Sequence, residues 1–445
     1  MRFNVPVLLI CLIIILASMT SIANADTEIV ITGDEEILTS AVFGNMTTPQ
    51  LNEEQIMGLS VTDDGRMFTV SHQGMWQERD DPTEVSLIAW GSDGAVLWFQ
   101  VTTHFDKVYY DVTNDGSFVY VAGFKDGDIL VEKFDFDGNQ VWNCTLDFGQ
   151  TEIGYEIRVM GDGTIIIGGE QEVEDPESSQ CFLLALNQTG QTQWYYEWGS
   201  YPSYLCDSNY LYVWKIGNTG NRFEKWESNG SVVWSDDCDS EFERFIGLTD
   251  DFVYTFSLEQ MHLAWNQPWQ IFWHSEVKIT TWHSETGVAV NSSRLKVFND
   301  EHQLFNETWV STGVDQEGGV WILMRPSGVI NSYGVYFLIS YNLETESTSI
   351  HKVLEHHLSR VLFEMDDFGN AYIASTSNLY GYFVMKYDSS QLNPSTSTST
   401  PTTRTQTVTY GFYNLMDWQV VSLVIIGVAI FDTIVILYFK RKAAD

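Results

Sequence analysis

The feature of this sequence that most restricts its fold is an internal repeat between residues 57 and 388. An Asp-Gly pair recurs at Asp64-Gly65, Asp115-Gly116 and Asp162-Gly163, and the pattern becomes degenerate further along the chain. The period is about 40 to 50 residues, which is typical of arrays of small repeated modules. The first four units also contain a glycine followed four residues later by a tryptophan: Gly94 and Trp98, Gly138 and Trp142, Gly190 and Trp194, Gly230 and Trp234. Seven units can be counted, starting near Met57, Val108, Tyr155, Ser203, Phe245, Trp309 and Ser359.

Each unit is predicted to fold as a small sheet of about four strands. Runs such as Phe118–Val121, Ile129–Val131 and Ile165–Ile167 are β-branched or aromatic and are bounded by turn residues. A unit of this length and strand content is typical of a propeller blade. The expected fold class is therefore all-β, a seven-bladed β-propeller, with one transmembrane helix added near the C-terminus.

The predicted ring lacks one strand. The seventh unit stops after its third strand, Tyr382–Lys386. We predict that the N-terminal run Glu28–Thr32 supplies the missing outer strand, which closes the ring and covers an exposed sheet edge. An open array or two separate β domains are the alternatives, because the middle units have lost part of their punctuation.

The second unit resembles a known repeat family. Residues 115–143 begin with Asp-Gly-Ser-Phe-Val-Tyr-Val-Ala-Gly and end with Gly-Asn-Gln-Val-Trp-Asn, which is similar to the SBBP-type β-propeller repeat. The Gly-x3-Trp ending also resembles repeats of the quinoprotein (PQQ-like) propellers. The resemblance implies a β-propeller fold and a cell-surface setting, as in surface proteins of bacteria and archaea. It implies no activity, because these families share none.

Both ends of the chain carry signals for export and membrane insertion. Arg2, the apolar run Val7–Ala17 and the small residues at Ala23-Asn24-Ala25 predict a signal peptide over residues 1–25, with the mature chain starting at Asp26. Val420–Phe439 is a mostly apolar run, long enough as a helix to cross a hydrocarbon core of about 30 Å. We predict a transmembrane helix with an aromatic flank over residues 410–439, and a cytoplasmic tail, residues 440–445, that begins with three basic residues.

These signals predict a single-pass protein of the cell membrane with a large extracellular part. Residues 26–388 form the propeller, and residues 389–409, rich in Ser and Thr with Pro, form an extended, O-glycosylated stalk. Six N-x-S/T sequons lie in the exported part and are candidates for surface glycosylation. They are Asn45, Asn143, Asn187, Asn229, Asn291 and Asn306.

The charge excludes one large class of partners. The chain has 22 Lys and Arg against 60 Asp and Glu, a formal net charge of −38, which repels the phosphates that dominate nucleic-acid affinity. With 44% hydrophobic residues the chain is also too apolar to be disordered. We expect an extracellular glycan or protein as the partner, and no nucleic acid.

The binding site is predicted on the face of the ring that points away from the membrane. The tight Asp-Gly and Gly-x3-Trp turns share one face with the exit of the stalk, so the longer connections lie on the opposite, distal face, where variable loops usually bind. One of these connections is an irregular insertion, Gln260–Val277, whose tryptophans either form an exposed stacking platform or pack into a local core. The candidate residues are Trp76, Asp80, Asp81, Glu172, Glu174, Asp175, Trp265, Trp269 and Trp273.

No cofactor is predicted. The acidic pair Asp80-Asp81 and the cluster Glu172–Glu177 could hold Ca²⁺, but neither completes a known calcium loop, and solvated acidic loops are the favoured interpretation. No metal motif fits the spacing of His262, His274 and His283. An exported chain with four cysteines is expected to form disulfides, with Cys144–Cys181 as the first choice and free buried thiols as the alternative. The disulfide candidates are Cys144, Cys181, Cys206 and Cys238.

The favoured function is that of a non-enzymatic adhesion or recognition module that binds a glycan, protein or matrix partner through its distal loops. A quinoprotein-like oxidoreductase is an alternative, although no ligand set for its cofactor can be assigned. A receptor subunit is another, because Asp432 lies inside the predicted membrane helix, where an acidic residue costs about 2.5 to 3.5 kcal/mol. Asp432 therefore indicates either a partner helix or one tolerated charge. No catalytic residues can be assigned from spacing.

Overall fold

The computed structural model describes the chain between residues 24 and 392, except residues 32–37, 41, 47–53, 74–82, 105–106, 173–179, 199–202, 216–220, 239–243, 268–269, 300–305, 316, 328–334, 343–346, 356–360, 367 and 378–380. In this part of the chain no helix is long and apolar enough to cross a membrane. The predicted membrane helix, its Asp432, the cytoplasmic tail and most of the predicted stalk lie outside the described residues.

The described strands form seven sheets, which we number as blades in chain order. Blade 1 contains β3 (Glu54–Val61), β4 (Met67–Gln73), β5 (Thr83–Trp90) and β6 (Val96–His104). Blade 2 contains β7 (Lys107–Asn114), β8 (Phe118–Lys125), β9 (Asp128–Asp135) and β10 (Gln140–Leu146). Blade 3 contains β11 (Thr151–Val159), β12 (Ile165–Glu172), β13 (Gln180–Leu186) and β14 (Thr192–Trp198). Blade 4 contains β15 (Ser203–Cys206), β16 (Tyr210–Lys215), β17 (Asn221–Glu227) and β18 (Val232–Cys238).

The last three blades include strands from both ends of the described chain. Blade 5 contains β19 (Arg244–Leu248), β20 (Phe252–Gln267), β21 (Gln270–His283), β22 (Ala289–Asn299) and the N-terminal β1 (Asn24–Ile31). Blade 6 contains β23 (Asn306–Val314), β24 (Gly319–Ser327), β25 (Val335–Asn342) and β26 (Ser347–Glu355). Blade 7 contains β27 (Val361–Met365), β28 (Ala371–Ser377), β29 (Gly381–Tyr387) and β2 (Val42–Met46), and a short helix α2 (Ser389–Leu392) follows it.

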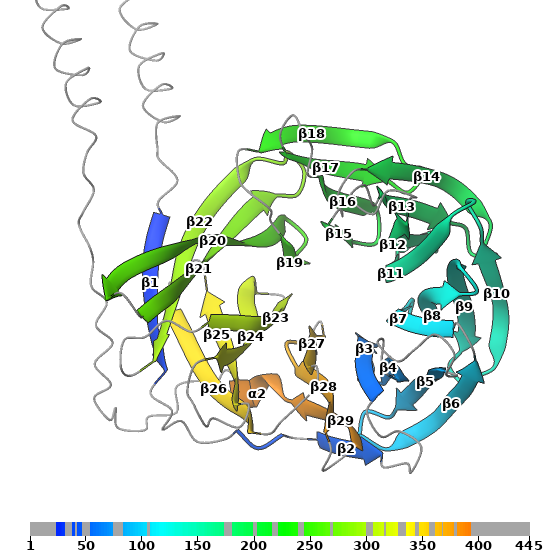
Figure 1. Ribbon diagram of the computed structural model, residues 1–445, viewed down its shortest axis with the longest axis horizontal. Coiled ribbons are helices and arrows are strands. Elements are labelled where there is room, and N and C mark those ends of the chain that lie inside the picture. The colour runs from blue at the N-terminus through cyan, green and yellow to red at the C-terminus, as the bar shows by residue number, and fades with distance from the viewer. Residues whose placement is uncertain are drawn as a thin grey trace, which may run out of the picture. The chain divides into compact units, whose positions relative to one another are not determined.

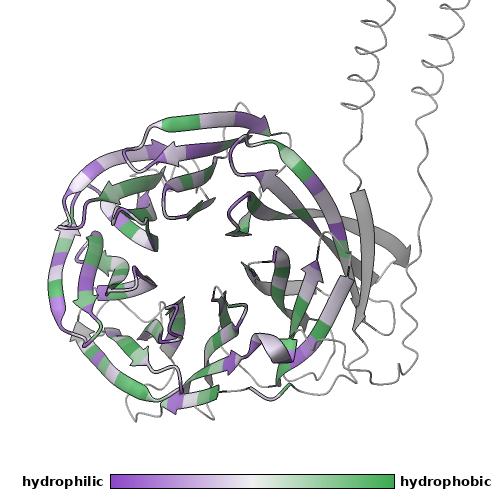
Figure 2. Cartoon of the chain, turned by 180° about the vertical axis from the view of Figure 1, so that it is seen from behind, coloured by the Kyte–Doolittle hydropathy of each residue, from purple (hydrophilic) through white to green (hydrophobic). Residues whose placement is uncertain are grey.

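The seven blades close into a ring. The first strand of each blade contacts the first strand of the next, in the order β3, β7, β11, β15, β19, β23, β27 and back to β3 (Figure 1). Seven clusters of buried apolar side chains lie between neighbouring blades, one at each interface. Figure 2 shows the apolar stretches within the strands of successive blades. The chain is therefore a seven-bladed β-propeller, as its repeat predicts.

The segment that completes blade 7 differs from the predicted one. β2 pairs antiparallel with β29, from Val42 opposite Lys386 to Met46 opposite Tyr382, and so fills the vacant outer position. The predicted run Glu28–Thr32 instead falls largely in β1, which pairs in parallel with β22 of blade 5. Gly44 permits a close approach to blade 1, because a Cβ at this position would overlap the carbonyl of Gly94. β2 thus fits where the outer edge of blade 7 approaches blade 1.

Between β1 and β2 the chain also contacts blade 6. The amide of Leu38 donates to the carbonyl of Lys352 in β26, at 2.7 Å. The N-terminal segment 24–46, which we call the N-terminal belt, therefore contacts the outer edges of blades 5, 6 and 7 in that order. It joins the two ends of the repeat in a ring, as expected, but it uses three anchor points instead of one.

The Gly-x3-Trp repeat has a structural role that joins neighbouring blades. Trp98, on the outer strand of blade 1, donates its indole N–H to the carbonyl of Phe136 in blade 2, at 2.7 Å. Its ring covers Gly138 in the same turn, where a Cβ would lie 2.9 Å from the ring. The same Trp-to-turn arrangement recurs three times along the ring. It joins Trp142 to Gln188 and Gly190, Trp194 to Ser228 and Gly230, and Trp234 to Ser284 and Gly287.

The four described cysteines form no disulfide, which corrects the predicted pairing. Cys144 lies on the fourth strand of blade 2 and Cys181 on the third strand of blade 3. Cys206 and Cys238 lie on the first and fourth strands of blade 4, three strand spacings of about 4.8 Å apart, which exceeds the Cα separation a disulfide allows. The thiol of Cys144 packs against an apolar cluster, and those of Cys206 and Cys238 donate to the backbone carbonyls of Val159 and Asp236 at 3.8 Å.

Five of the predicted glycosylation sites have described side chains. Asn45, Asn143 and Asn229 are exposed, and Asn187 and Asn291 are half-buried. The backbone of Asn306 lies in β23, and its side chain lies outside the described part. Glycosylation of these positions stays a prediction.

Candidate functional site

The two faces of the ring are built differently. One face, which we call the turn face, carries the connections from first to second and from third to fourth strand of each blade. These turns are short, and their side chains form hydrogen bonds with the backbone of the same turn. The Asp115 carboxylate, for example, accepts hydrogen bonds from the amides of Ser117 and Phe118, at 2.9 and 2.7 Å. The opposite face, the connection face, carries the second-to-third strand connections and the links between blades. A binding site is expected on the connection face.

The chain leaves the propeller on the turn face. After β29 it enters α2, where the amide of Ser389 donates to Oδ1 of Asn370 at 3.0 Å. Asn370 lies in the first turn of blade 7, which the carboxylate of Asp366 organises by accepting from the amides of Phe368 and Asn370. The last described residues of the chain therefore lie beside the turn face, and the connection face is the side away from α2. Departure of the stalk from this side stays a prediction.

Six of the nine predicted binding residues lie outside the described residues. They are Trp76, Asp80, Asp81, Glu174, Asp175 and Trp269. The backbones of Glu172, Trp265 and Trp273 lie in β12, β20 and β21, and their side chains lie outside the described part. The exposure of these tryptophans therefore stays a prediction.

The insertion in blade 5 is a hairpin, which corrects the predicted irregular loop. β20 and β21 have 16 and 14 residues, and they continue to pair from Leu258 opposite Val277 to Gln267 opposite Gln270. Its end projects beyond the outline of the ring in Figure 1. The cause is that a run of β-branched and aromatic residues satisfies its backbone groups most simply by prolonging a ladder that has already begun.

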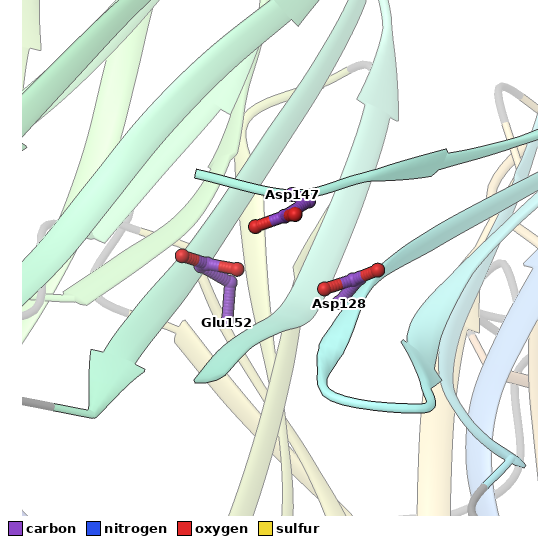
Figure 3. A group of neighbouring side chains, drawn as sticks. All are labelled: Asp128, Asp147 and Glu152. Atoms are coloured by element: carbon purple, nitrogen blue, oxygen red, sulfur yellow. The ribbon is translucent and has the colours of Figure 1, made fainter. Parts of the chain in front are cut away.

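Three carboxylates meet on the connection face between blades 2 and 3 (Figure 3). Asp128 begins β9, Asp147 follows β10, and Glu152 is the second residue of β11. Each offers an oxygen within 4.8 Å of the others. This group is not evident from the sequence, because its members come from two blades. The Asp126-Gly127-Asp128 run was the one available signal.

Tight backbone geometry brings these carboxylates together. Asp126 and Gly127 form a two-residue turn in which both residues have positive φ, 55° and 104°, the pattern of a type I′ hairpin. The carbonyl of Gly127 accepts the amide of Glu152 at 2.9 Å, which ties the turn of blade 2 to the first strand of blade 3. Asp147 accepts the amide of Gly149 at 2.7 Å and so folds the link between the blades. Backbone hydrogen bonds therefore hold the segments that carry the three carboxylates close together.

Burial and mutual repulsion disfavour the charged forms of two of these groups. The pKa of Asp128 is raised by burial and then by the negative charges of Asp147 and Asp126. The pKa of Glu152 is raised by burial and by Asp147 and Asp128, although the backbone amides of Gln150 and Phe148 act in the opposite direction. Among the described residues, no Lys or Arg forms an ion pair with any of them.

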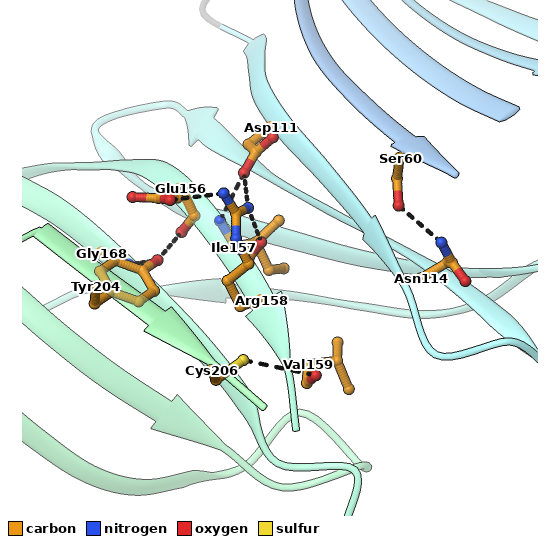
Figure 4. A network of polar contacts seen from close by, with 10 residues as sticks. All are labelled: Ser60, Asp111, Asn114, Glu156, Ile157, Arg158, Val159, Gly168, Tyr204 and Cys206. Atoms are coloured by element: carbon orange, nitrogen blue, oxygen red, sulfur yellow. Dashed lines mark hydrogen bonds and ion pairs between the residues drawn. The ribbon is translucent and has the colours of Figure 1, made fainter. Parts of the chain in front are cut away.

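A second polar group lies on the first strands around the centre of the ring (Figure 4). Arg158 of β11 forms ion pairs with Asp111 of β7 at 2.8 Å and with Glu156 of its own strand at 2.7 Å. Tyr204 of β15 donates to the carbonyl of Glu156 and accepts the amide of Gly168, both at 2.8 Å. These contacts connect the first strands of blades 2, 3 and 4.

Glu364 of β27 belongs to the same centre. Its pKa is raised to about 8, chiefly by burial; Arg158 and the amide of Val61 act to lower it, and the negative charges of Asp111 and Asp366 act to raise it. Its Oε2 has no hydrogen-bond partner among the described residues. Alternating charges on first strands, such as Glu156 and Arg158, are the signal from which this network could have been predicted.

No protein-family model matches the sequence, and no curated protein matches it. Acylaminoacyl peptidase from Pyrococcus horikoshii is 8% identical over 77% of this chain and 53% of its own, with a TM-score of 0.46. A puromycin hydrolase is 11% identical over 79% of this chain and 55% of its own, with a TM-score of 0.47. An oligogalacturonate lyase in complex with manganese is 14% identical over 76% of this chain and 99% of its own, with a TM-score of 0.42. This chain spans about half the length of the peptidase and the hydrolase. These likenesses assign no activity to it.

Proposed function

We propose that this chain is a cell-surface recognition protein. Its propeller is displayed outside the cell on a glycosylated stalk and a single C-terminal membrane helix, and it binds an extracellular glycan or protein through the connection face. Its repeat is of the SBBP type. Asp432 pairs the membrane helix with a polar group on a neighbouring helix.

The observation that carries this proposal is the asymmetry between the two faces. The chain leaves blade 7 on the turn face, where short turns bind their own backbone. The connection face holds the prolonged β20–β21 hairpin and the group of carboxylates. A stalk that starts on the turn face presents the connection face to the surroundings, where variable segments on a rigid ring usually bind.

The hairpin supplies the test. In the full chain, purified in detergent, residues 260–275 are replaced by a two-residue Asn-Gly turn between Glu259 and Glu276, which are cross-strand partners. Wild type and variant are screened against arrays of glycans and of extracellular proteins. We expect the variant to bind the partner at least tenfold more weakly, because the hairpin contributes the anchoring side chains.

Phe368→Ala is the matched control. Phe368 lies in the first turn of blade 7 on the turn face and is 66% exposed, so its removal tests a large apolar side chain on the wrong side of the ring. Full binding by Phe368→Ala and weak binding by the hairpin variant support the proposal. The reverse result, or equal binding by both variants, contradicts it.

A further inference from the structure

We propose that Asp128, Asp147 and Glu152 bind a divalent cation, with Ca²⁺ preferred, where blade 2 meets blade 3. This site goes beyond the proposed recognition function and does not depend on it. Three like charges within 4.8 Å of one another, without a Lys or Arg ion pair among the described residues, repel one another strongly. A cation between them would convert that repulsion into attraction.

The carboxylate of Glu152 is the second, independent sign of a ligand. Glu152 is 0% exposed. Its Oε1 accepts the amide of Gln150 at 2.9 Å and the side-chain amide of Gln171 at 3.4 Å. Its Oε2 is buried and has no hydrogen-bond partner in the described part of the chain. Buried polar atoms normally have a hydrogen-bond partner. A buried carboxylate oxygen without one, beside two other carboxylates, is therefore suited to coordinate a metal ion.

The donor set selects the kind of cation. All three side chains offer oxygen, and the group contains no His or Cys, so a hard cation fits and zinc or copper does not. The three ligands come from β9, from the link after β10 and from β11, which places them on separate stretches of backbone. Ca²⁺ tolerates such irregular surroundings better than Mg²⁺, which demands near-octahedral geometry.

The exposure of Asp147 leaves one side of the group open to solvent. Water can therefore complete the coordination shell, and the cation can enter and leave. A site with few protein ligands and an open side belongs to the weaker range of calcium sites, with a Kd of about 10⁻⁴ to 10⁻³ M. That range suits an extracellular setting.

Titration calorimetry with CaCl₂ on the full chain in detergent, after treatment with a chelator, tests the site. We expect one saturable binding event, weaker by at least tenfold with MgCl₂. Asp147→Asn removes one charge at an exposed position and is expected to weaken Ca²⁺ binding at least tenfold. Glu152→Gln, which keeps the hydrogen bond from Gln150, is expected to have the same effect. Asp147→Asn decides the question if Glu152→Gln does not fold.

Asp137→Asn is the matched control, because Asp137 is an exposed aspartate of the same blade on the turn face. Unchanged Ca²⁺ binding by this variant supports the site. The proposal is overturned if the wild type shows no saturable binding below about 10 mM Ca²⁺, or if Asp147→Asn and Asp137→Asn bind Ca²⁺ equally well. In the first case a shared proton, not a metal, relieves the repulsion.

Discussion

Blades 1 to 4 and blades 5 to 7 are held together by different devices. The outer strand of each of blades 1 to 4 carries a tryptophan that packs on a glycine turn of the next blade. These contacts lie at four successive interfaces. Blade 5 has Asn291 where the repeat would place the next tryptophan, four residues after Gly287. From there on, the N-terminal belt contacts the outer edges of blades 5, 6 and 7, and Gly44 lies against blade 1.

Neighbouring blades of this ring are joined on the outside either by contacts that are local in sequence or by a distant segment. Each tryptophan contact joins residues 34 to 50 positions apart. The belt joins residues near the N-terminus to strands near residues 290 and 380. Local contacts lose less chain entropy when they form, so blades 1 to 4 are expected to assemble before the belt closes the ring.

The largest effect is expected at the belt, from Gly44→Ala. The new Cβ would overlap the carbonyl of Gly94, and backbone on both sides prevents an easy adjustment. We expect a loss of about 3 kcal/mol in the free energy of unfolding, measured by denaturant titration of the full chain.

Gly91→Ala is the control for that experiment. A Cβ at Gly91 would meet the end of the Asp93 side chain, which can rotate away. It is expected to cost less than about 1 kcal/mol. If the two alanines destabilise the chain equally, β2 does not close the ring in the way described.

The next effect concerns a tryptophan contact of the regular blades. Trp194→Ala removes the ring that covers Gly230, the hydrogen bond to Ser228 and the contact with Trp226. Because Trp194 is only half-buried, we expect a loss of about 2 kcal/mol by the same titration. Trp194→Phe keeps an aromatic ring and loses the N–H donor, so it should cost about 1 kcal/mol.

The tryptophan contact and the belt are expected to stabilise the ring independently. Trp194 and Gly44 lie at different interfaces and share no partners, so the double variant should lose the sum of both effects within about 0.5 kcal/mol. A markedly smaller or larger loss would show that the two devices do not act separately.

The sequence predicted the blades well because their punctuation has a local physical cause. Gly65, Gly116 and Gly163 all have positive φ, which glycine alone adopts at no cost, so the turns could be read one by one. The belt could not be read in this way. Any strand-like run can pair with any open edge, and only the ring shows that Gly44 must lie against Gly94.

The same limit applies to the site. Asp128 and Glu152 are 24 positions apart in sequence, and they meet only because the Gly127 carbonyl accepts the Glu152 amide across the blade boundary. The Gly-x3-Trp pattern marks a glycine and a tryptophan of the same unit, but in the structure each tryptophan covers the glycine of the following unit. Contacts between blades are thus what the linear pattern conceals.

The pH dependence of stability probes the centre where the two parts meet. Glu364 of blade 7 has a pKa of about 8 against its usual 4.5, so the folded protein holds a proton there that the unfolded chain releases. Stability from this group is complete below about pH 4.5 and is lost as the pH rises to about 8, at roughly 1 kcal/mol per pH unit. We expect Glu364→Gln to remove this slope in unfolding titrations across that range.

Glu227→Gln, at an exposed glutamate of β17, is the control and should keep the slope of the wild type. If Glu364→Gln and Glu227→Gln follow the same curve, Glu364 is not held protonated at the centre. The difference between the curves removes the contribution of all other titrating groups.

The smallest effect is expected from a reducing agent. All four described cysteines lie in blades 2, 3 and 4, so a disulfide would staple the regular part of the ring and would contribute about 2 to 4 kcal/mol. Because the structure contains no disulfide between them, dithiothreitol should leave the unfolding midpoint unchanged. Alkylation in denaturant without reductant, followed by peptide mapping, should label each of the four. A pair that is labelled only after reduction would show that a disulfide also holds blades 2 to 4 together. The tryptophan contacts alone would then not explain the difference between the two parts of the ring.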